Sequence, residues 1–280
     1  MQVTGKVTLP AGKRVAVNIG CDFDAFTVWM TTFNETSQAY MSRGEYGAEV
    51  GVPRLLKLFE KHGVKASFCI PGHTADTFPD ACRSIIAGGH EVVHHGYVHE
   101  NPAKLSYDEE VEVIERGLES LGRLGVQPRG YRSPGWDFSE SSMALLEKYD
   151  FLYDSSLMAN DFYPYKPRYV GVNLDRANTF GEPSKIIELP VTWFLDDFPY
   201  SEKVNSRDGL RSPFEMLEIW KSYFDYAHDN CEGACVIFTT HPQTIGRPHN
   251  IQMLERLIEY LKGKDVWFAT MEEIAQATVF

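Results

Sequence analysis

The sequence predicts an α/β fold with a parallel sheet, formed by a single domain that covers residues 1–280. Short apolar runs alternate with helix-like patterns from one end of the chain to the other, which is the pattern of repeated strand and helix units. No linker, low-complexity run or internal repeat interrupts this alternation. Repeated units with short connections form parallel sheets, and about eight of them in one undivided chain favour a barrel over a doubly wound sheet.

The strand candidates are short and apolar, and turn or helix signals bound each of them. They cover residues 15–19, 66–70, 90–93, 130–132, 151–153, 186–189, 235–240 and 266–268. Helix ends are marked by Pro in a first turn and by Gly after a last turn. These signals predict helices over residues 53–63 and 79–87.

Capping patterns predict the other helices of the chain. A Ser or Thr that precedes a Glu by three residues forms a capping box, which satisfies backbone N–H groups of the first turn. The candidate boxes are Ser106 with Glu109, Ser212 with Glu215, and Thr270 with Glu273. Ser139 is a single-residue cap for the helix that follows it. A further helix is expected around Leu254–Leu261.

Composition excludes two classes of partner. The formal net charge is −12, from 27 basic and 39 acidic residues, and no basic stripe interrupts the acidic balance. Phosphate backbones and anionic lipid surfaces attract basic proteins, so we expect neither nucleic acid nor membrane as a partner. No stretch approaches the roughly 18 apolar residues of a membrane span.

The sequence predicts a cytoplasmic protein. Residues 1–20 contain no apolar core of signal-peptide length. The five cysteines are odd in number and scattered, which is typical of reduced thiols rather than of a disulfide framework. Cys231 and Cys235 are the only close pair, and their spacing of three intervening residues with no second pair argues against a structural zinc site.

Polar residues follow the predicted strands at their carboxyl ends. In a barrel, these ends converge on one rim, so that residues far apart in sequence come within reach of one ligand. The candidates for this rim are Asp22, Asp24, His95, His99, Arg132, Asp154 and His241.

Three of these residues predict a metal site. His95 and His99 are four residues apart and can point the same way, and Asp24 from another strand completes a face of two imidazoles and one carboxylate. Such a face leaves coordination positions open for water and substrate, as in hydrolytic zinc sites. Zn²⁺ is the expected ion, although Mn²⁺, Co²⁺ and Fe²⁺ accept the same ligands. The alternative is a solvated histidine cluster that includes His90 and His94.

The remaining rim residues are candidates for proton transfer and orientation. If Asp24 binds a metal, Asp22 lies close enough to take a proton from bound water, although both could be ordinary acidic residues at a strand end. His241 could protonate a departing nitrogen, or it could be a buried structural histidine. Arg132 and Asp154 could orient the site, or they could simply pair with each other or with a neighbour.

These residues resemble the motifs of the polysaccharide deacetylase superfamily, carbohydrate esterase family 4. The resemblance spans nearly the whole chain, and the counterparts of the five motifs are Cys21–Asp24, His95–His99, Arg132–Trp136, Tyr153–Ser156 and Thr240–Gln243. Longer segments are similar to the branch that contains the helicobacter-type peptidoglycan deacetylase and the bacterial cyclic imidases. They are Gly44–Phe59, His95–Asn101, Asn160–Tyr165 and Leu189–Asp197.

The resemblance implies a distorted (β/α)7 barrel and a homotetramer. It implies a zinc-type metal held by Asp24, His95 and His99, with Asp22 as the base and His241 as the acid. The chain departs from the family pattern in its first motif, where Phe23 separates two aspartates that are usually adjacent.

Aromatic residues near the motifs suggest a closed site for a small molecule. The candidates are Trp136, Phe162, Tyr163, Tyr165 and Trp193, of which about half are expected in the core. We take Trp136, Tyr163 and Trp193 as the substrate contacts.

The sequence therefore predicts a metal-dependent hydrolase that acts on C–N bonds of non-peptide amides or imides, with a small cyclic imide as the favoured substrate. The first alternative is N-deacetylation of peptidoglycan or another acetylated glycan. A non-haem iron oxygenase and a non-catalytic binding module are the others, and the retained Asp22 and His241 argue against the last.

Overall fold

A ten-stranded sheet organises the structure, a computed structural model that describes residues 1–204 and 207–280. Every strand predicted from the sequence is part of this sheet, and each pairs in parallel with a neighbour, which confirms the α/β class. In spatial order the parallel strands are β11 (Ile187–Glu188), β7 (Tyr153–Asp154), β6 (Gly130–Tyr131), β5 (Glu91–His94), β4 (Ser67–Ile70), β3 (Val15–Asp22) and β14 (Ala234–Thr240), with β15 (Val266–Phe268) also on β3.

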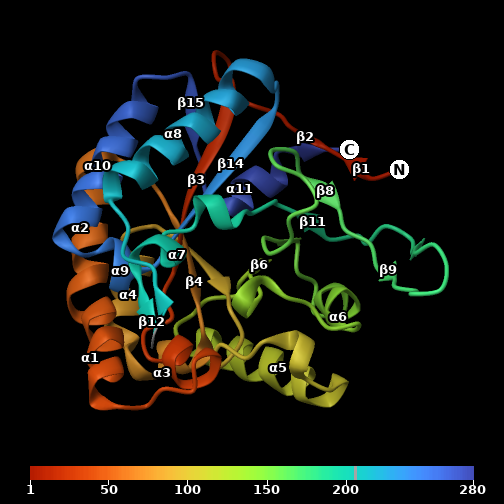
Figure 1. The fold of residues 1–280 in the computed structure, drawn as a ribbon, viewed down its shortest axis with the longest axis horizontal. Coiled ribbons are helices and arrows are strands. Elements are labelled where there is room, and N and C mark those ends of the chain that lie inside the picture. The colour runs from red at the N-terminus through yellow and green to blue at the C-terminus, as the bar shows by residue number, and fades with distance from the viewer. Residues whose placement is uncertain (205–206) are drawn as a thin grey trace.

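Strand β3 lies at the centre of this arrangement. It pairs with β14 along one edge, while β15 and β4 share its other edge at successive positions. Figure 1 shows β3 and β14 side by side, although they come from opposite ends of the chain. All eight residues of β3 are buried, as expected for a parallel strand covered on both faces.

The segment after β11 returns to the sheet at β14. Asp196 forms an isolated parallel bridge with Thr239, and the backbone N–H of Asp197 donates to the carbonyl of Thr239. Because β3 occupies one edge of β14, this bridge uses the other edge. One bridge is not a paired strand, so closure into a (β/α)7 barrel stays a prediction.

Several very short strands were not predicted. Strand β8 (Tyr165–Lys166) pairs antiparallel with β11, and β1 (Val3–Thr4) pairs with β8. Three two-stranded ribbons lie outside the main sheet: β2 (Lys6–Val7) with β16 (Thr278–Val279), β9 (Val170–Gly171) with β10 (Thr179–Phe180), and β12 (Lys203–Val204) with β13 (Arg207–Asp208). Each has only two residues, too few to show alternation, and unlike the equally short β6, β7 and β11 none lies in a segment with strand signals in the sequence.

Helices cover the sheet on its outer side. In Figure 1, α2 and α10 lie along one side of the sheet and α5 lies at another, while the segment around β9 projects from the body. The helices are α1 (Gln38–Tyr46), α2 (Val52–His62), α3 (Gly72–Thr77), α4 (Pro79–Ala87), α5 (Tyr107–Arg123), α6 (Ser142–Lys148), α7 (Phe198–Ser201), α8 (Pro213–Asn230), α9 (Pro242–Ile245), α10 (Pro248–Lys262) and α11 (Met271–Gln276). Among the described residues, no helix is both long enough and apolar enough to span a bilayer.

Two of the three predicted capping boxes form. Ser106 and Thr270 each exchange hydrogen bonds with the glutamate three residues later, at the starts of α5 and α11. The third prediction is wrong in detail, because the hydroxyl of Ser212 accepts from the N–H of Phe214 rather than forming a box. The hydroxyl of Ser139 accepts from the N–H groups of Ser141 and Ser142, but the N-cap of α6 is Ser141, so the predicted cap is two residues out of place.

The largest apolar cluster lies between the sheet and the helices α2, α8 and α10. Helix α2 directs Leu55 and Phe59 into it from one face, and both side chains are fully buried. This packing holds the inner strands rigidly, so the residues at their carboxyl ends are positioned by the core rather than by flexible loops.

The Ser106 cap provides a test of the helix assignments. We expect Ser106→Ala to lower the free energy of unfolding by about 1 kcal/mol, because a backbone N–H of α5 loses its acceptor. Urea denaturation followed by circular dichroism measures the change. Ser222→Ala, at an exposed position inside α8, is the matched control and should leave stability unchanged or slightly higher. An equal loss in both variants would contradict the cap.

Candidate metal centre and pocket

The carboxyl ends of the central strands meet in one buried region. Asp22 ends β3, His95 directly follows β5, and His241 directly follows β14. Because the three strands run parallel within one sheet, these ends lie on the same side. All three side chains are buried.

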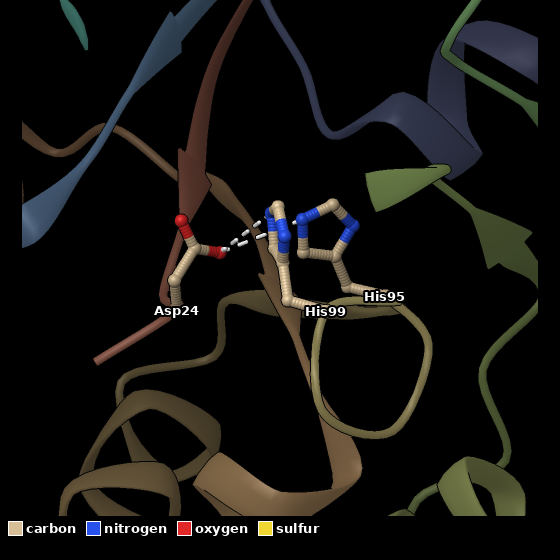
Figure 2. A group of neighbouring side chains, drawn as sticks. All are labelled: Asp24, His95 and His99. Atoms are coloured by element: carbon tan, nitrogen blue, oxygen red, sulfur yellow. Dashed lines mark ion pairs between the residues drawn. The ribbon is translucent and has the colours of Figure 1, made fainter. Parts of the chain in front are cut away.

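Asp24, His95 and His99 form a compact cluster. The Oδ1 atom of Asp24 lies 3.5 Å from Nε2 of His95 and 3.9 Å from Nε2 of His99. Figure 2 shows both imidazole rings directed at this carboxylate, with dashed lines for the two ion pairs. One potential ligand atom from each residue lies within 4.8 Å of the other two. This spacing leaves room for an ion between them.

Unpaired buried atoms indicate that the cluster fits a metal. Both carboxylate oxygens of Asp24 and the Nε2 atom of His95 are buried without a hydrogen-bond partner among the described residues. Unpaired buried polar atoms are rare and costly, and a bound ion is one of the few groups that explains them. The donor set of two imidazoles and one carboxylate suits zinc-type ions.

The outer nitrogens of both imidazoles are held by neighbours. Nδ1 of His95 lies 2.6 Å from the carbonyl oxygen of Arg132, which only accepts hydrogen bonds, so Nδ1 carries a proton and Nε2 presents its lone pair. Nδ1 of His99 lies 2.7 Å from the hydroxyl of Thr32. Metal-binding histidines are oriented by such contacts.

The turn that carries the two histidines has unusual backbone angles. Gly96 has a φ of 70°, a region that favours glycine, and His99 itself has a φ of 62°. A non-glycine residue in this region is held there by its surroundings, and such residues concentrate at functional sites. The turn brings both rings of the His95–His99 motif to the same carboxylate.

Asp22 is held as a carboxylate by Arg132. Its Oδ1 atom accepts a hydrogen bond of 2.8 Å from Nη1 of Arg132, and both side chains are buried. Burial raises the pKa of Asp22, but the charges of Arg132, His95 and His241, together with the hydrogen bond from Arg132, outweigh burial and lower the pKa to about 2. Asp22 is therefore ionised at neutral pH, as a proton acceptor must be.

His241 is surrounded by carboxyl groups. Its Nδ1 atom lies 2.8 Å from Oδ1 of Asp197 and 3.5 Å from Oδ1 of Asp196, while its Nε2 atom lies 3.7 Å from Oδ2 of Asp24. Burial lowers the pKa of His241, whereas Asp196 and Asp197 raise it, and the net result is about 10. The imidazole is therefore protonated at neutral pH, as a proton donor must be.

A pocket opens over this cluster. It has a volume of about 490 Å³, its mouth included. The apolar part of its wall is largely aromatic, and the Trp136 and Trp193 rings pack together with centroids 4.3 Å apart. The pocket is lined by Asp22, Asp24, Val28, Thr32, Phe33, His95, His99, Gly135, Trp136, Trp193, Asp196, Phe198 and His241.

Comparison with known proteins identifies the family. A family model described as polysaccharide deacetylase matches residues 27–153. A peptidoglycan deacetylase of Helicobacter pylori is 36% identical, with 94% of this chain and 96% of the relative aligned. The chain belongs to the polysaccharide deacetylase family. It is therefore a hydrolase of the deacetylase type, acting on C–N bonds, and the oxygenase alternative loses its support.

Other relatives agree with this assignment. The peptidoglycan deacetylase-like protein FGM2 of Gibberella zeae is 30% identical, with 95% of this chain and 87% of the relative aligned. A solved structure from Mycobacterium smegmatis is 36% identical with a TM-score of 0.83, covering 97% of this chain and 92% of that one. The structure of Puue allantoinase has a TM-score of 0.78 at 23% identity, covering 96% and 91%, and shows the same fold.

Asp154 lies outside the pocket of this deacetylase-family chain. Arg132 pairs with Asp22 instead of Asp154, and Asp154 lies beside Glu188, opposite it in the register of β7 and β11. Burial raises the pKa of both carboxyl groups. Because Asp154 is absent from the lining and fully buried, the geometry supports a structural role rather than the catalytic one expected.

Tyr163 also lies away from the pocket. Its hydroxyl neighbours Cys231, which precedes β14, whereas the pocket lies at the opposite end of that strand. The expected substrate contact is therefore not formed by this residue. Trp136 and Trp193 do line the pocket. Phe162 is a core residue, and Tyr165 is buried on β8.

Five further residues that build the site were not predicted from the sequence. Asp197 holds the imidazole of His241, and Thr32 holds that of His99. Asp196, Phe33 and Phe198 line the pocket, and the two phenylalanine rings stack with centroids 5.8 Å apart. Asp196 and Asp197 stand in a segment that resembles the family, which was the signal available for them.

Metal titration tests the cluster directly. We expect His95→Ala to weaken Zn²⁺ binding by more than roughly 100-fold, because it removes one of three ligands. Thr32→Val should weaken it by roughly 10- to 100-fold, the cost of losing a group that orients a ligand. Isothermal titration of the metal-stripped protein measures both. Tyr163→Phe is the control, and unchanged binding in His95→Ala would refute the site.

Proposed function

We propose that this chain is a metal-dependent hydrolase that opens a small cyclic imide. The observation that carries the proposal is the pocket, whose lining combines the candidate metal ligands with two pairs of packed aromatic rings, Trp136 with Trp193 and Phe33 with Phe198. Apolar pockets with a few convergent polar groups suit small, flat, uncharged molecules. An uncharged imide also tolerates the acidic residues around the site.

Asp24, His95 and His99 would hold the metal. When bound there, a zinc-type ion lowers the pKa of a bound water and polarises the substrate carbonyl. The orphaned oxygens of Asp24 and the lone pair on Nε2 of His95 are the atoms that support this assignment.

The remaining groups handle protons. Asp22 accepts a proton from the attacking water, and Arg132 keeps it ionised and fixes its orientation. As the C–N bond breaks, His241 donates the proton on Nε2 to the departing nitrogen, while Asp197 holds Nδ1 on the other side of the ring. Base and acid are thus supplied by β3 and β14, adjacent strands of the sheet.

N-deacetylation of an acetylated glycan is the second candidate function. A relative named peptidoglycan deacetylase is 36% identical over nearly the whole chain, and the same groups would cut an acetamide. The two functions need differently shaped binding sites, since a glycan needs an open groove beside the metal ligands and an imide does not. The aromatic walls of the pocket favour the imide.

A substrate comparison tests the proposal. We expect the Zn²⁺-loaded protein to hydrolyse succinimide and to leave an N-acetylglucosamine oligomer unchanged, with product formation followed by chromatography. Asp22→Asn should keep the metal but reduce turnover by roughly 100-fold or more, the effect of losing a general base. Activity on the oligomer alone would transfer the assignment to deacetylation, and full turnover by Asp22→Asn would remove Asp22 from the mechanism.

The pH profile tests the pairing of His241 with Asp197. Activity that needs protonated His241 is lost as the pH rises through the pKa of this imidazole, which nearby carboxylates raise to about 10. Asp197→Asn removes one of these charges, so we expect the alkaline limb of kcat to move to lower pH. The acidic limb should stay in place, because Asp22 keeps Arg132. An unmoved alkaline limb would assign that limb to another group.

A further inference from the structure

One short segment supplies a large part of the pocket wall. Residues 193–198 contribute Trp193, Asp196 and Phe198 to the lining. The segment is anchored to the sheet, because the backbone of Asp196 forms the bridge with Thr239. Asp196 is thus a carboxyl group between two aromatic rings of its own segment. It raises the pKa of His241, but it neither gives nor takes a proton in the steps described above.

The two oxygens of Asp196 differ in their surroundings. Oδ1 accepts a hydrogen bond of 2.8 Å from the N–H of Phe198 and lies 3.5 Å from Nδ1 of His241. Oδ2 accepts no hydrogen bond from any described residue. The side chain is only 2% exposed, but Oδ2 is not among the fully buried unpaired atoms, so it keeps a small exposure through which solvent or a ligand can reach it. A carboxylate oxygen that faces a pocket without a donor is a site for a donor from the ligand.

The N–H of His241 does not serve as the hydrogen-bond donor to Asp196. The imidazole Nδ1 already has a shorter partner in Asp197, at 2.8 Å against 3.5 Å, and Asp197 is itself held by the hydroxyl of Thr244. One N–H makes one good hydrogen bond, so Asp197 takes the positioning role. Asp196 remains available for the substrate.

The chemistry of the pocket limits what Asp196 can bind. Burial raises the pKa of Asp196 to about 7, so its ionised and its protonated forms are both present at neutral pH. The ionised form accepts hydrogen bonds and repels anions, so its partner is a neutral or cationic donor. A cyclic imide carries one such donor, the N–H between its two carbonyl groups. An N-alkylated imide has the same carbonyl groups and a similar shape but no donor.

We propose that Asp196 accepts a hydrogen bond from the N–H of the substrate and thereby selects N-unsubstituted imides over N-alkylated ones. This inference rests on the proposed function and deepens it, because it assigns substrate preference to one side chain. Rejection is expected to be strong, since an N-alkyl group leaves a buried acceptor unpaired beside it.

The test compares matched substrates on matched variants. Succinimide and N-methylsuccinimide are assayed with the Zn²⁺-loaded wild type and with Asp196→Asn. The asparagine can keep its carbonyl oxygen toward the N–H of Phe198 and replaces the free oxygen with an amide NH₂, which cannot accept. We expect the ratio of kcat/KM for succinimide to that for N-methylsuccinimide to fall by roughly 10- to 100-fold, mainly through the KM of succinimide. The ratio is the readout because the charge of Asp196 also raises the pKa of His241, which acts on both imides.

Asp197→Asn is the matched control, since it makes the same change at the neighbouring residue. Because Asp197 acts through His241, we expect this variant to lower kcat for both imides alike. A parallel loss for both imides in Asp196→Asn would overturn the inference and make Asp196 a second positioning residue.

Failure of the proposed function is distinguishable from failure of this inference. If the wild type hydrolyses neither imide, the imide assignment fails, and the same variants are then assayed on acetanilide and N-methylacetanilide. If the wild type prefers acetanilide to N-methylacetanilide and Asp196→Asn abolishes that preference, the hydrogen bond is supported for an amide substrate. No preference in the wild type, or one that the variant retains, would overturn it.

Discussion

The buried ion pair between Arg132 and Asp22 is the interaction on which the rest of the site depends. The guanidinium reaches Asp22 across the sheet and also donates to the backbone carbonyl and hydroxyl of Ser155. The backbone carbonyl of the same arginine accepts a hydrogen bond from Nδ1 of His95. Arg132, which directly follows β6, therefore fixes the proposed base Asp22, the candidate metal ligand His95 and the neighbouring strand end. A buried guanidinium that lost its carboxylate would cost several kcal/mol, so these contacts form together.

Much of the candidate site could be predicted from the sequence because its residues lie at the carboxyl ends of strands. Strand candidates and their order were readable from apolar runs, and parallel pairing then required Asp22, His95 and His241 to converge. The contacts that escaped prediction depend on registers which sequence does not encode locally. Asp197 meets His241 only because Asp196 bridges β14, 43 residues away in the chain. Likewise, the register of β7 and β11 decides that the partner of Asp154 is Glu188.

Reaction type and substrate are controlled by different parts of this fold. The residues proposed to transfer protons and the candidate metal ligands lie on or next to the inner strands, which the core holds in place. The walls come from connecting segments, such as residues 193–198 and the turn that carries Trp136. Such segments accept substitutions more readily than core strands do. The connecting segments therefore decide whether a polymer or a small ring fits above such a centre.

The density of acidic groups around His241 affects the folding equilibrium of the protein. Four carboxyl groups, two around the end of β3 and two before α7, share one buried region with the positive charges of Arg132 and His241. Folding brings these like charges together, and their repulsion opposes it. A divalent cation bound by the folded state alone would relieve this repulsion and shift the folding equilibrium. The amount of folded protein would then follow the supply of that ion, because unfolded chains are removed by proteolysis.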